Sequence, residues 1–325
     1  MRVLLTGGSG FVGGHLAHVL AAEGHELRLL VRPTSDTSFV DDVEFERAVG
    51  DLRQAETLHS ACEGMDAVVH AAAVLRAVQQ RDFMHANRQG TRQLAEAAAN
   101  AGVERFVYVS SIAARGPAPG LEPESPETPL HPASAYGRSK AAGEEALLEH
   151  RGRFSITIIR PPVVYGPADT GLQAFFWMAQ RGFCVRLDDG SNLIDVIYGP
   201  DLAEAVGAVL RSSPQELAQY DPRSEEGPFS WNDMLTCLGD VAGKTLLIPS
   251  VPGAVFHGFA RCLEYWAALS NGAPLLDRTR VTEMRQRAWI CDASSLTVDT
   301  GWRAKTPLAV GMQQTMAWYL EQGLA

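Results

Sequence analysis

Short apolar runs alternate with longer amphipathic runs through the first half of the chain. The apolar runs are rich in valine and leucine and are bounded by glycine or polar residues, which is typical of buried strands. We predict strands at Arg2–Leu5, Glu26–Val31, Val43–Val49, Ala67–His70 and Phe106–Ser110. Helical periodicity fills the segments between them, including a long helix from Asp82 to Asn100. This alternation indicates an α/β fold, a doubly wound parallel sheet with right-handed crossovers.

Beyond Pro167 the alternation becomes irregular. We predict that Leu193–Tyr198 returns to the sheet as a strand and that a helix begins near Asp201. The second half therefore contributes to the sheet and also forms a smaller, interleaved C-terminal region. The expected division is residues 1–167 with 193–212 for the sheet domain, and residues 168–192 with 213–325 for the other region.

Two helices of that region are unusually apolar. Gly171–Gln180 is equally consistent with a core helix and with the wall of a substrate pocket. Pro252–Leu269 has apolar side chains at helical spacing, and its polar side carries only Arg261 and Glu264. A helix of this kind can lie on a membrane, but so little charge argues against strong surface binding. We predict that it is a lid or wall over a hydrophobic pocket.

The turn after the first strand contains glycines at three-residue spacing, Gly7, Gly10 and Gly13. Gly7 permits a tight turn, Gly10 permits close approach of a pyrophosphate, and Gly13 permits close packing of helix on strand. Phe11 and Val12 open the helix, whose N-terminus favours negative charge. The sequence therefore predicts a Rossmann dinucleotide site, and the C-terminal region becomes the candidate substrate-binding region.

The ends of the following strands indicate which dinucleotide binds. Arg32 follows the second strand, where a cation favours a 2′-phosphate and an acidic residue favours a free 2′-hydroxyl. NADP(H) is favoured, with NAD(H) as the alternative because Asp36 follows closely. Asp51, beside Leu52, could accept from the adenine amino group or simply cap the next helix. The small residues Ala71, Ala72 and Ala73 leave space for the cofactor, although tight packing would favour them equally.

A candidate catalytic set follows the fifth strand. Tyr136 and Lys140 are four residues apart and share one face of a helix. A phenol has an ordinary pKa of about 10, and an adjacent ammonium with the positive nicotinamide ring would favour its anionic form. Ser111 could hold a substrate oxygen while Tyr136 exchanges its proton. These three residues would polarise a carbonyl group for hydride transfer.

Composition excludes several classes of function. The chain of 325 residues has a net charge of −10 and no dense run of lysine and arginine, which argues against a nucleic-acid surface. No uncharged apolar stretch reaches the roughly 18 residues of a membrane span, and the first strand begins at residue 2, so we expect a cytoplasmic protein without an integral membrane segment. The five cysteines and nine histidines show no metal-ligand spacing, so no metal site is predicted.

With these residues in view, the chain resembles the extended short-chain dehydrogenase/reductase family over nearly its full length. The matching blocks are Thr6–Gly13, Tyr108–Ser111, Tyr136 with Lys140, and Arg160–Pro167. The resemblance implies that Asn87 belongs to the catalytic set and that Pro161 and Val163 lie beside the nicotinamide. It also implies a homodimer formed by the helices around 82–100 and 136–150.

Departures from the family pattern narrow the expected substrate. Val163 stands where many sugar-nucleotide members carry an asparagine that contacts the substrate's phosphates. The residues after Ser111 are Ile112-Ala-Ala-Arg115, without the acidic residues of the sugar dehydratases. The chain is more similar to the dihydroflavonol-reductase and hydroxysteroid-dehydrogenase branch. That resemblance implies an NADP(H)-dependent oxidoreductase that interconverts a ketone and a secondary alcohol on a small to medium apolar substrate.

Two other functions stay open at this point. One is a sugar-nucleotide epimerase, which would use the same residues for a transient oxidation and keep NAD tightly bound. The other is a non-catalytic protein that senses the dinucleotide or acts as a scaffold, against which the intact Ser111, Tyr136 and Lys140 argue.

Overall fold

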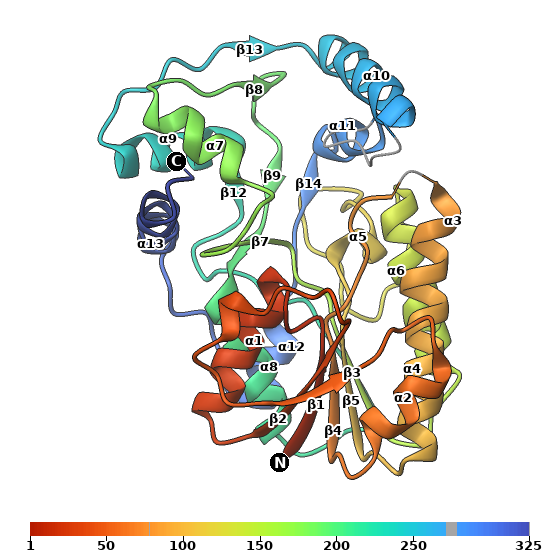
Figure 1. Ribbon diagram of the computed structural model, residues 1–325. Helices are drawn as coiled ribbons and strands as arrows, with labels where there is room; N and C mark the ends of the chain where they lie inside the picture. The colour runs from red at the N-terminus through yellow and green to blue at the C-terminus, as the bar shows by residue number, and fades with distance from the viewer. Residues whose placement is uncertain (78, 271–277, 325) are drawn as a thin grey trace.

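The computed structural model describes residues 1–77, 79–270 and 278–324. Its centre is a seven-stranded parallel sheet with the order β11-β6-β5-β4-β1-β2-β3 (Figure 1). The strands are β1 (Arg2–Thr6), β2 (Glu26–Val31), β3 (Glu46–Val49), β4 (Ala67–His70), β5 (Arg105–Val109), β6 (Ser155–Ile159) and β11 (Leu217–Tyr220). The predicted doubly wound Rossmann sheet is confirmed.

Helices cover both faces of this sheet (Figure 1). One face packs against α1 (Phe11–Ala22), α8 (Gly199–Arg211) and α12 (Ser294–Thr300). The other face packs against α2 (Ala55–Cys62), α4 (Gly90–Asn100) and α6 (Ala135–Leu148). Each face has its own buried cluster of aliphatic side chains, which is why the sheet strands are apolar on both sides.

The seventh strand of the sheet is a correction to the sequence analysis. The segment predicted to return to the sheet, Leu193–Tyr198, instead forms β9 (Leu193–Ile194) and β10 (Val196–Tyr198) in two small separate sheets. The strand that joins the main sheet is β11, beside β6, from residues expected in the substrate-binding region. Its alternating burial explains the error, because an edge strand carries a weaker apolar signal than a central one.

The segments outside the main sheet form a smaller unit with its own buried cluster. Its remaining strands are β7 (Val163–Tyr165), β8 (Arg186–Leu187), β12 (Phe229–Ser230), β13 (Ser250–Val251) and β14 (Ala288–Trp289). Its helices are α7 (Gln173–Gln180), α9 (Trp231–Ala242), α10 (Gly253–Ser270), α11 (Arg278–Met284) and α13 (Leu308–Glu321). One isolated bridge joins Leu247 to Phe183.

Two expected helices differ in detail. The long helix predicted at Asp82–Asn100 consists of α3 (Gln80–Phe83), a π-helical turn at Met84–Gln89, and α4. In α10, Val255, Phe259 and Tyr265 are exposed, so these side chains do not line a pocket of this chain. Among the described residues, no helix is both long and apolar enough to span a bilayer.

The close contact of the glycine turn with α1 generates a stability prediction. A Cβ atom on Gly13 would lie 2.0 Å from the Gly7 carbonyl oxygen, so Gly13→Ala forces the helix away from the strand. We expect a loss of about 3 kcal/mol in the free energy of unfolding, measured by urea denaturation, and weaker dinucleotide binding. Gly258→Ala is the control, since nothing lies within 4 Å of its Cβ position. An unchanged Gly13→Ala variant would contradict this packing.

Candidate active site

The predicted site residues converge on the carboxyl edge of the main sheet. The strands β1, β4 and β5 are neighbours, and their ends lead into the glycine turn, the three alanines and Ser111 respectively. The Thr6 carbonyl accepts from the Ala71 N–H at 3.1 Å, so the first two of these segments touch. Ligands of open α/β sheets bind at this edge, where the strand order reverses.

The glycine turn fits a pyrophosphate. Gly7 has φ of +78°, a conformation that L side chains rarely adopt, and its carbonyl accepts from the Gly10 N–H at 2.9 Å. Gly10 is the N-cap of α1, and no side chain caps this helix or places an acidic group in its first turn. Phe11, Val12 and Gly13 thus begin a helix whose N-terminal N–H groups suit an anionic ligand.

Tyr136 and Ser111 lie together at this edge. The helix α6 begins one residue before Tyr136, and the Ser134 hydroxyl caps it by accepting from the Gly137 N–H at 2.9 Å. Burial raises the pKa of Tyr136 to about 12, while a hydrogen bond with the Ser111 hydroxyl acts in the opposite direction. The phenol of the protein alone is therefore a neutral proton donor over the physiological pH range.

The raised pKa of Tyr136 is opposite to the sequence-based expectation, in which the Lys140 ammonium would lower the pKa of the phenol. The Lys140 ammonium is buried, donates to the Val109 carbonyl at 2.8 Å and lies 4.1 Å from the centroid of the Tyr108 ring. Burial lowers the pKa of Lys140 to about 7, partly opposed by the negative charge of Glu144. Without the cofactor, desolvation of Tyr136 therefore outweighs any stabilisation of its phenolate.

Asn87 has the contacts of a positioning residue. It lies buried in the π-helical turn, where its Oδ1 accepts from the Val74 N–H at 2.8 Å. Its Nδ2 donates to the Val74 carbonyl at 3.1 Å and to the Ser139 hydroxyl at 2.9 Å. These bonds fix the segment after β4 to α6, at the residue before Lys140. A direct catalytic role for Asn87 stays a prediction.

The adenine end of the expected site carries more positive charge than the sequence analysis recognised. Arg32 is exposed, and its charge helps to lower the pKa of Asp51. The larger cause is Arg53, which binds the Asp51 carboxylate through both oxygens at 3.1 and 2.9 Å and holds its pKa at about 2. Asp51 does not cap α2, whose N-cap is Gln54 without a side-chain bond. Leu52 packs beside Gly90 at the start of α4.

The alanines and the nicotinamide-side segment also have structural contacts. A Cβ on Gly7 would lie 2.6 Å from the Ala72 backbone nitrogen, so the glycine turn and the segment 71–73 are in close contact through their backbones. Pro161 is buried, and its carbonyl accepts from the Ile112 N–H at 2.9 Å. Val163 is half-buried at the start of β7. Their roles toward a cofactor stay predictions.

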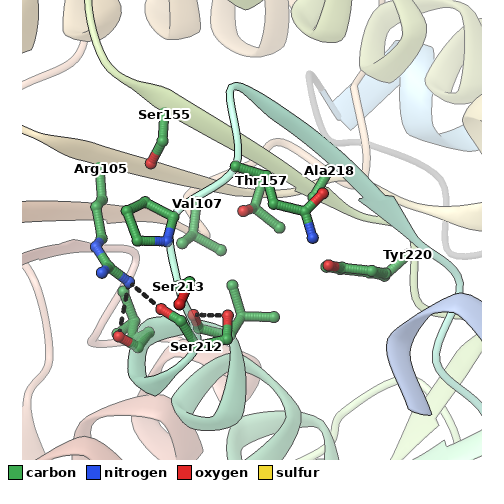
Figure 2. Close-up of a pocket in the computed structure, with 12 residues that line it drawn as sticks. Arg105, Val107, Ser155, Thr157, Ser212, Ser213, Ala218 and Tyr220 are labelled. Atoms are coloured by element: carbon green, nitrogen blue, oxygen red, sulfur yellow. Dashed lines mark hydrogen bonds between the residues drawn. The ribbon is translucent and has the colours of Figure 1, made fainter. Parts of the chain in front are cut away.

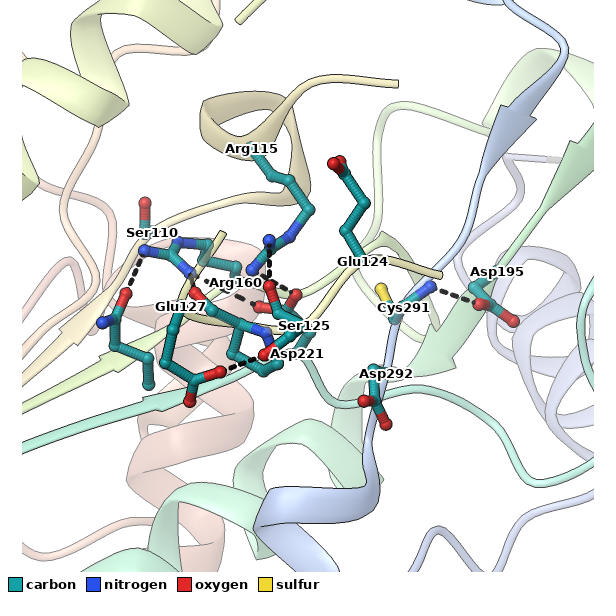
Figure 3. A network of polar contacts seen from close by, with 12 residues as sticks. Ser110, Arg115, Glu124, Ser125, Glu127, Arg160, Asp195, Asp221, Cys291 and Asp292 are labelled. Atoms are coloured by element: carbon teal, nitrogen blue, oxygen red, sulfur yellow. Dashed lines mark hydrogen bonds and ion pairs between the residues drawn. The ribbon is translucent and has the colours of Figure 1, made fainter. Parts of the chain in front are cut away.

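A buried ionic network behind the site was not anticipated (Figure 3). Arg160 binds both oxygens of the Glu144 carboxylate at 2.9 and 2.7 Å, and Glu144 also bonds the Ser110 hydroxyl. A second pair joins Arg115 to Asp221 at 2.6 Å. Glu144 is four residues after Lys140 and eight after Tyr136, so its position on the same helical face was the available signal.

Charged groups also face Tyr136 from α11. The positive charge of Arg280 lowers the pKa of the phenol and the negative charge of Glu283 raises it. Arg76, in the segment after β4, is in turn affected by Arg280 and by the buried Asp169. The surroundings of the Tyr136 hydroxyl are therefore more polar than the expected hydrophobic pocket.

Cavities elsewhere do not belong to this site. One cavity of about 10 Å³, the size of a single water, lies between β5, β6 and the segment after α8 (Figure 2). There Arg105, at the start of β5, donates to the carbonyls of Leu210 and Ser212. Arg105 stands at the amino end of β5, at the opposite edge of the sheet from the glycine turn. It therefore pairs with the free carbonyls at the C-terminus of α8 rather than with a ligand.

Comparison with known proteins agrees with this geometry. The model of the family described as "NAD dependent epimerase/dehydratase family" matches residues 3–219. The chain belongs to this family. Its members are NAD(P)-dependent enzymes of the extended short-chain dehydrogenase/reductase type, including reductases, epimerases and dehydratases.

Three similar proteins illustrate the range of the family. A ceramide reductase of Caulobacter vibrioides is 29% identical over 321 residues, covering 99% of this chain and 95% of that protein. A 4-hydroxy-2-methyl-3-oxo-4-farnesyl-3,4-dihydroquinoline-1-oxide ketoreductase of Stigmatella aurantiaca is 34% identical over 275 residues, covering 83% and 82%. The solved UDP-glucose 4-epimerase of Thermus thermophilus, in complex with NAD, has a TM-score of 0.79 at 25% identity, covering 98% and 99%.

A buried histidine at the sheet edge generates a pH prediction. His70 bonds the hydroxyls of Thr6 at 2.6 Å and Thr91 at 3.0 Å, and burial lowers its pKa from 6.5 to about 3. His70 binds a proton more readily in the unfolded chain than in the folded protein. The contribution of the buried, neutral imidazole to the free energy of unfolding is therefore complete above pH 6.5 and is lost as the pH falls. Between pH 6.5 and 5 the loss is about 2 kcal/mol.

Urea denaturation at the two pH values tests this account. His70→Gln should be less stable at neutral pH and should lose less stability on acidification than the unmodified protein. The exposed His59→Gln variant is the control and should keep the full acid sensitivity. Equal acid sensitivity in both variants would show that His70 is not the group concerned.

Proposed function

We propose that the protein is an NADP(H)-dependent reductase that interconverts a ketone and a secondary alcohol. The observation that carries this proposal is the hydrogen bond of Ser111 with a neutral Tyr136, at the same edge of the sheet as the glycine turn. The bound dinucleotide would supply the hydride. A ketone oxygen held by the Ser111 hydroxyl then receives the proton of the Tyr136 phenol as negative charge develops on it. Reduction needs the protonated phenol, and burial keeps it protonated.

Lys140 has a supporting role in this proposal. Its ammonium is one helical turn from Tyr136, within reach of the phenol or of a ribose hydroxyl once a ligand fills the edge. Leaving the Val109 carbonyl and the Tyr108 ring would bring its positive charge nearer to the phenolate that forms during reduction. Stabilisation of that phenolate lowers the barrier to proton transfer.

The proposed substrate is an apolar ketone of small to medium size. Val163 offers no hydrogen bond where many sugar-nucleotide members place an asparagine. Two relatives that match most of the chain are named as reductases of a ceramide and of a farnesylated quinoline, both of which are lipid-like molecules. Arg280 and Glu283 would then contact a polar head that carries the reacting oxygen.

A sugar-nucleotide epimerase is the second candidate. The charge of Arg280 acts both on Tyr136 and on Arg76, and two such cations would suit a diphosphate. A solved relative is a UDP-glucose 4-epimerase in complex with NAD. Purified epimerase would contain NAD and bind UDP-sugars saturably, whereas the reductase would need added NADPH. A non-catalytic sensor would bind the dinucleotide and turn over neither class of substrate.

We also propose a homodimer through α4 and α6, which gel filtration would detect.

The central prediction concerns the phenol. Tyr136→Phe removes the proton donor and keeps the ring, so we expect turnover of a ketone to fall by about 10³-fold or more. NADPH binding should change little. Steady-state kinetics measure the first effect and fluorescence titration the second. Tyr265→Phe, an exposed tyrosine of α10, is the matched control and should keep full activity. Near-normal turnover by Tyr136→Phe would rule out this mechanism.

The cofactor preference is tested at Arg32. Arg53 neutralises Asp51, so the free positive charge beside the ribose belongs to Arg32. Arg32→Ala should weaken NADPH binding about 10- to 100-fold, as for loss of a charge-assisted hydrogen bond, and leave NADH binding nearly unchanged. Arg303→Ala, another exposed arginine, should change neither. Equal affinities of the unmodified protein for the two cofactors would refute the 2′-phosphate assignment.

A further inference from the structure

The helix α10 turns large apolar side chains to solvent, while its protein-facing side is mixed and includes the buried Ala260 and the half-buried Leu263. Its exposed positions include Val255 and Phe259, each 58% exposed, Tyr265 at 68%, and the exposed Cys262. These residues share one side of the helix at a period of 3.6. The polar residues His257 and Glu264 are instead half-buried toward the protein. Surface helices normally turn charged side chains to water and apolar ones to the core.

The exposed side of α10, which we call the α10 face, is also unusual in its charge. It consists of Ala254, Val255, Gly258, Phe259, Arg261, Cys262 and Tyr265. Arg261 is its one charged residue, in a protein with a net charge of −10. Acidic residues, which keep the rest of the surface soluble, are therefore excluded from this face. Apolar side chains can enter a lipid–water interface while an aromatic hydroxyl and a single cation stay at its polar side; with so little charge, any binding would depend on burial of the apolar groups.

The position of α10 supports the same interpretation. The helix stands at the upper margin of the molecule, at the far end from the main sheet, and packs against α11 (Figure 1). The next helix, α11, carries Arg280 and Glu283, whose charges act on Tyr136. A molecule held at the α10 face would thus be one helix away from the catalytic hydroxyl.

We propose that the α10 face inserts into the surface of a lipid bilayer and places the active site next to a membrane-dissolved substrate. The choice of a lipid-like substrate rests on the proposed function, because an apolar ketone with a long chain partitions into bilayers. The occupant is zwitterionic lipid, since the strong net negative charge of the protein repels an anionic surface.

A second copy of the chain fits this face less well. The exposed side chains of the α10 face present on the order of 400 Å², estimated from the size of such residues. A stable protein interface buries about 800 Å² on each partner. The face is also a single protruding helix (Figure 1), whereas the homodimer proposed above uses α4 and α6 on another side of the molecule.

Vesicle flotation tests the proposal with the full-length protein. The unmodified protein should float with phosphatidylcholine vesicles and should do so equally well at high salt, because burial of apolar groups is not screened. Val255→Glu with Phe259→Glu should lower the partition coefficient about 100-fold, from the lost burial of two apolar side chains. The control is Val298→Glu on α12, a position that is 82% exposed and lies outside the α10 face. It should float like the unmodified protein.

Three results would overturn the proposal. The first is that the unmodified protein does not float. The second is that it floats only with phosphatidylglycerol and only at low salt. The third is that light scattering shows an oligomer that the double substitution dissociates. Thermal unfolding of the double variant should be unchanged, since both residues are exposed. Its activity on a water-soluble ketone should also be unchanged. Flotation and ketone reduction are measured separately, which distinguishes the two proposals. A protein that floats but does not reduce ketones would contradict the proposed function and leave the membrane proposal standing.

Discussion

The ion pair between Glu144 and Arg160 joins the parts of the structure on which the site depends. Glu144 belongs to α6, the helix that carries Tyr136 and Lys140, and its carboxylate also bonds Ser110, the residue before Ser111. Arg160 follows β6 and donates to the Pro126 carbonyl at 2.7 Å, which anchors the loop that precedes α6. Loss of either partner would leave a buried charge uncompensated, a cost of about 3–5 kcal/mol. The pair therefore fixes the helix, the strand end and the loop relative to one another.

This arrangement explains why charge can be buried so close to Tyr136 and Lys140. Glu144 is four residues from Lys140, and its negative charge opposes the desolvation that lowers the pKa of that ammonium. Arg160 compensates Glu144 in turn, so the charges of Lys140, Glu144 and Arg160 alternate in sign in the interior beside α6. Buried polar groups are tolerated when each has a partner, and such networks specify one geometry. A scaffold of this kind holds reacting groups in place without ligand.

The predictable part of the structure is the part with local signals. Buried parallel strands are continuously apolar, the glycine turn has a fixed spacing, and Tyr136 and Lys140 share a helical face, so each could be inferred from neighbouring residues. The strand β11 could not, because it is short, half-buried and paired with a strand far away in sequence. The burial of Glu144 depends on a partner brought close only by the fold. The outward face of α10 was missed because periodicity reports amphipathicity and not which side meets the protein.

The place of β11 in the sheet limits how this protein can be altered. The chain completes its main sheet only after it has passed through α7 and the small strands of the second unit, and α12 returns to the sheet later still. Neither unit is one continuous segment, so no single cut yields two pieces that keep their cores. A chain ending before β11 would expose the backbone of β6 as a free edge, which favours aggregation. New substrate preferences are therefore more accessible through changes within the interleaved segments than through exchange of a whole domain.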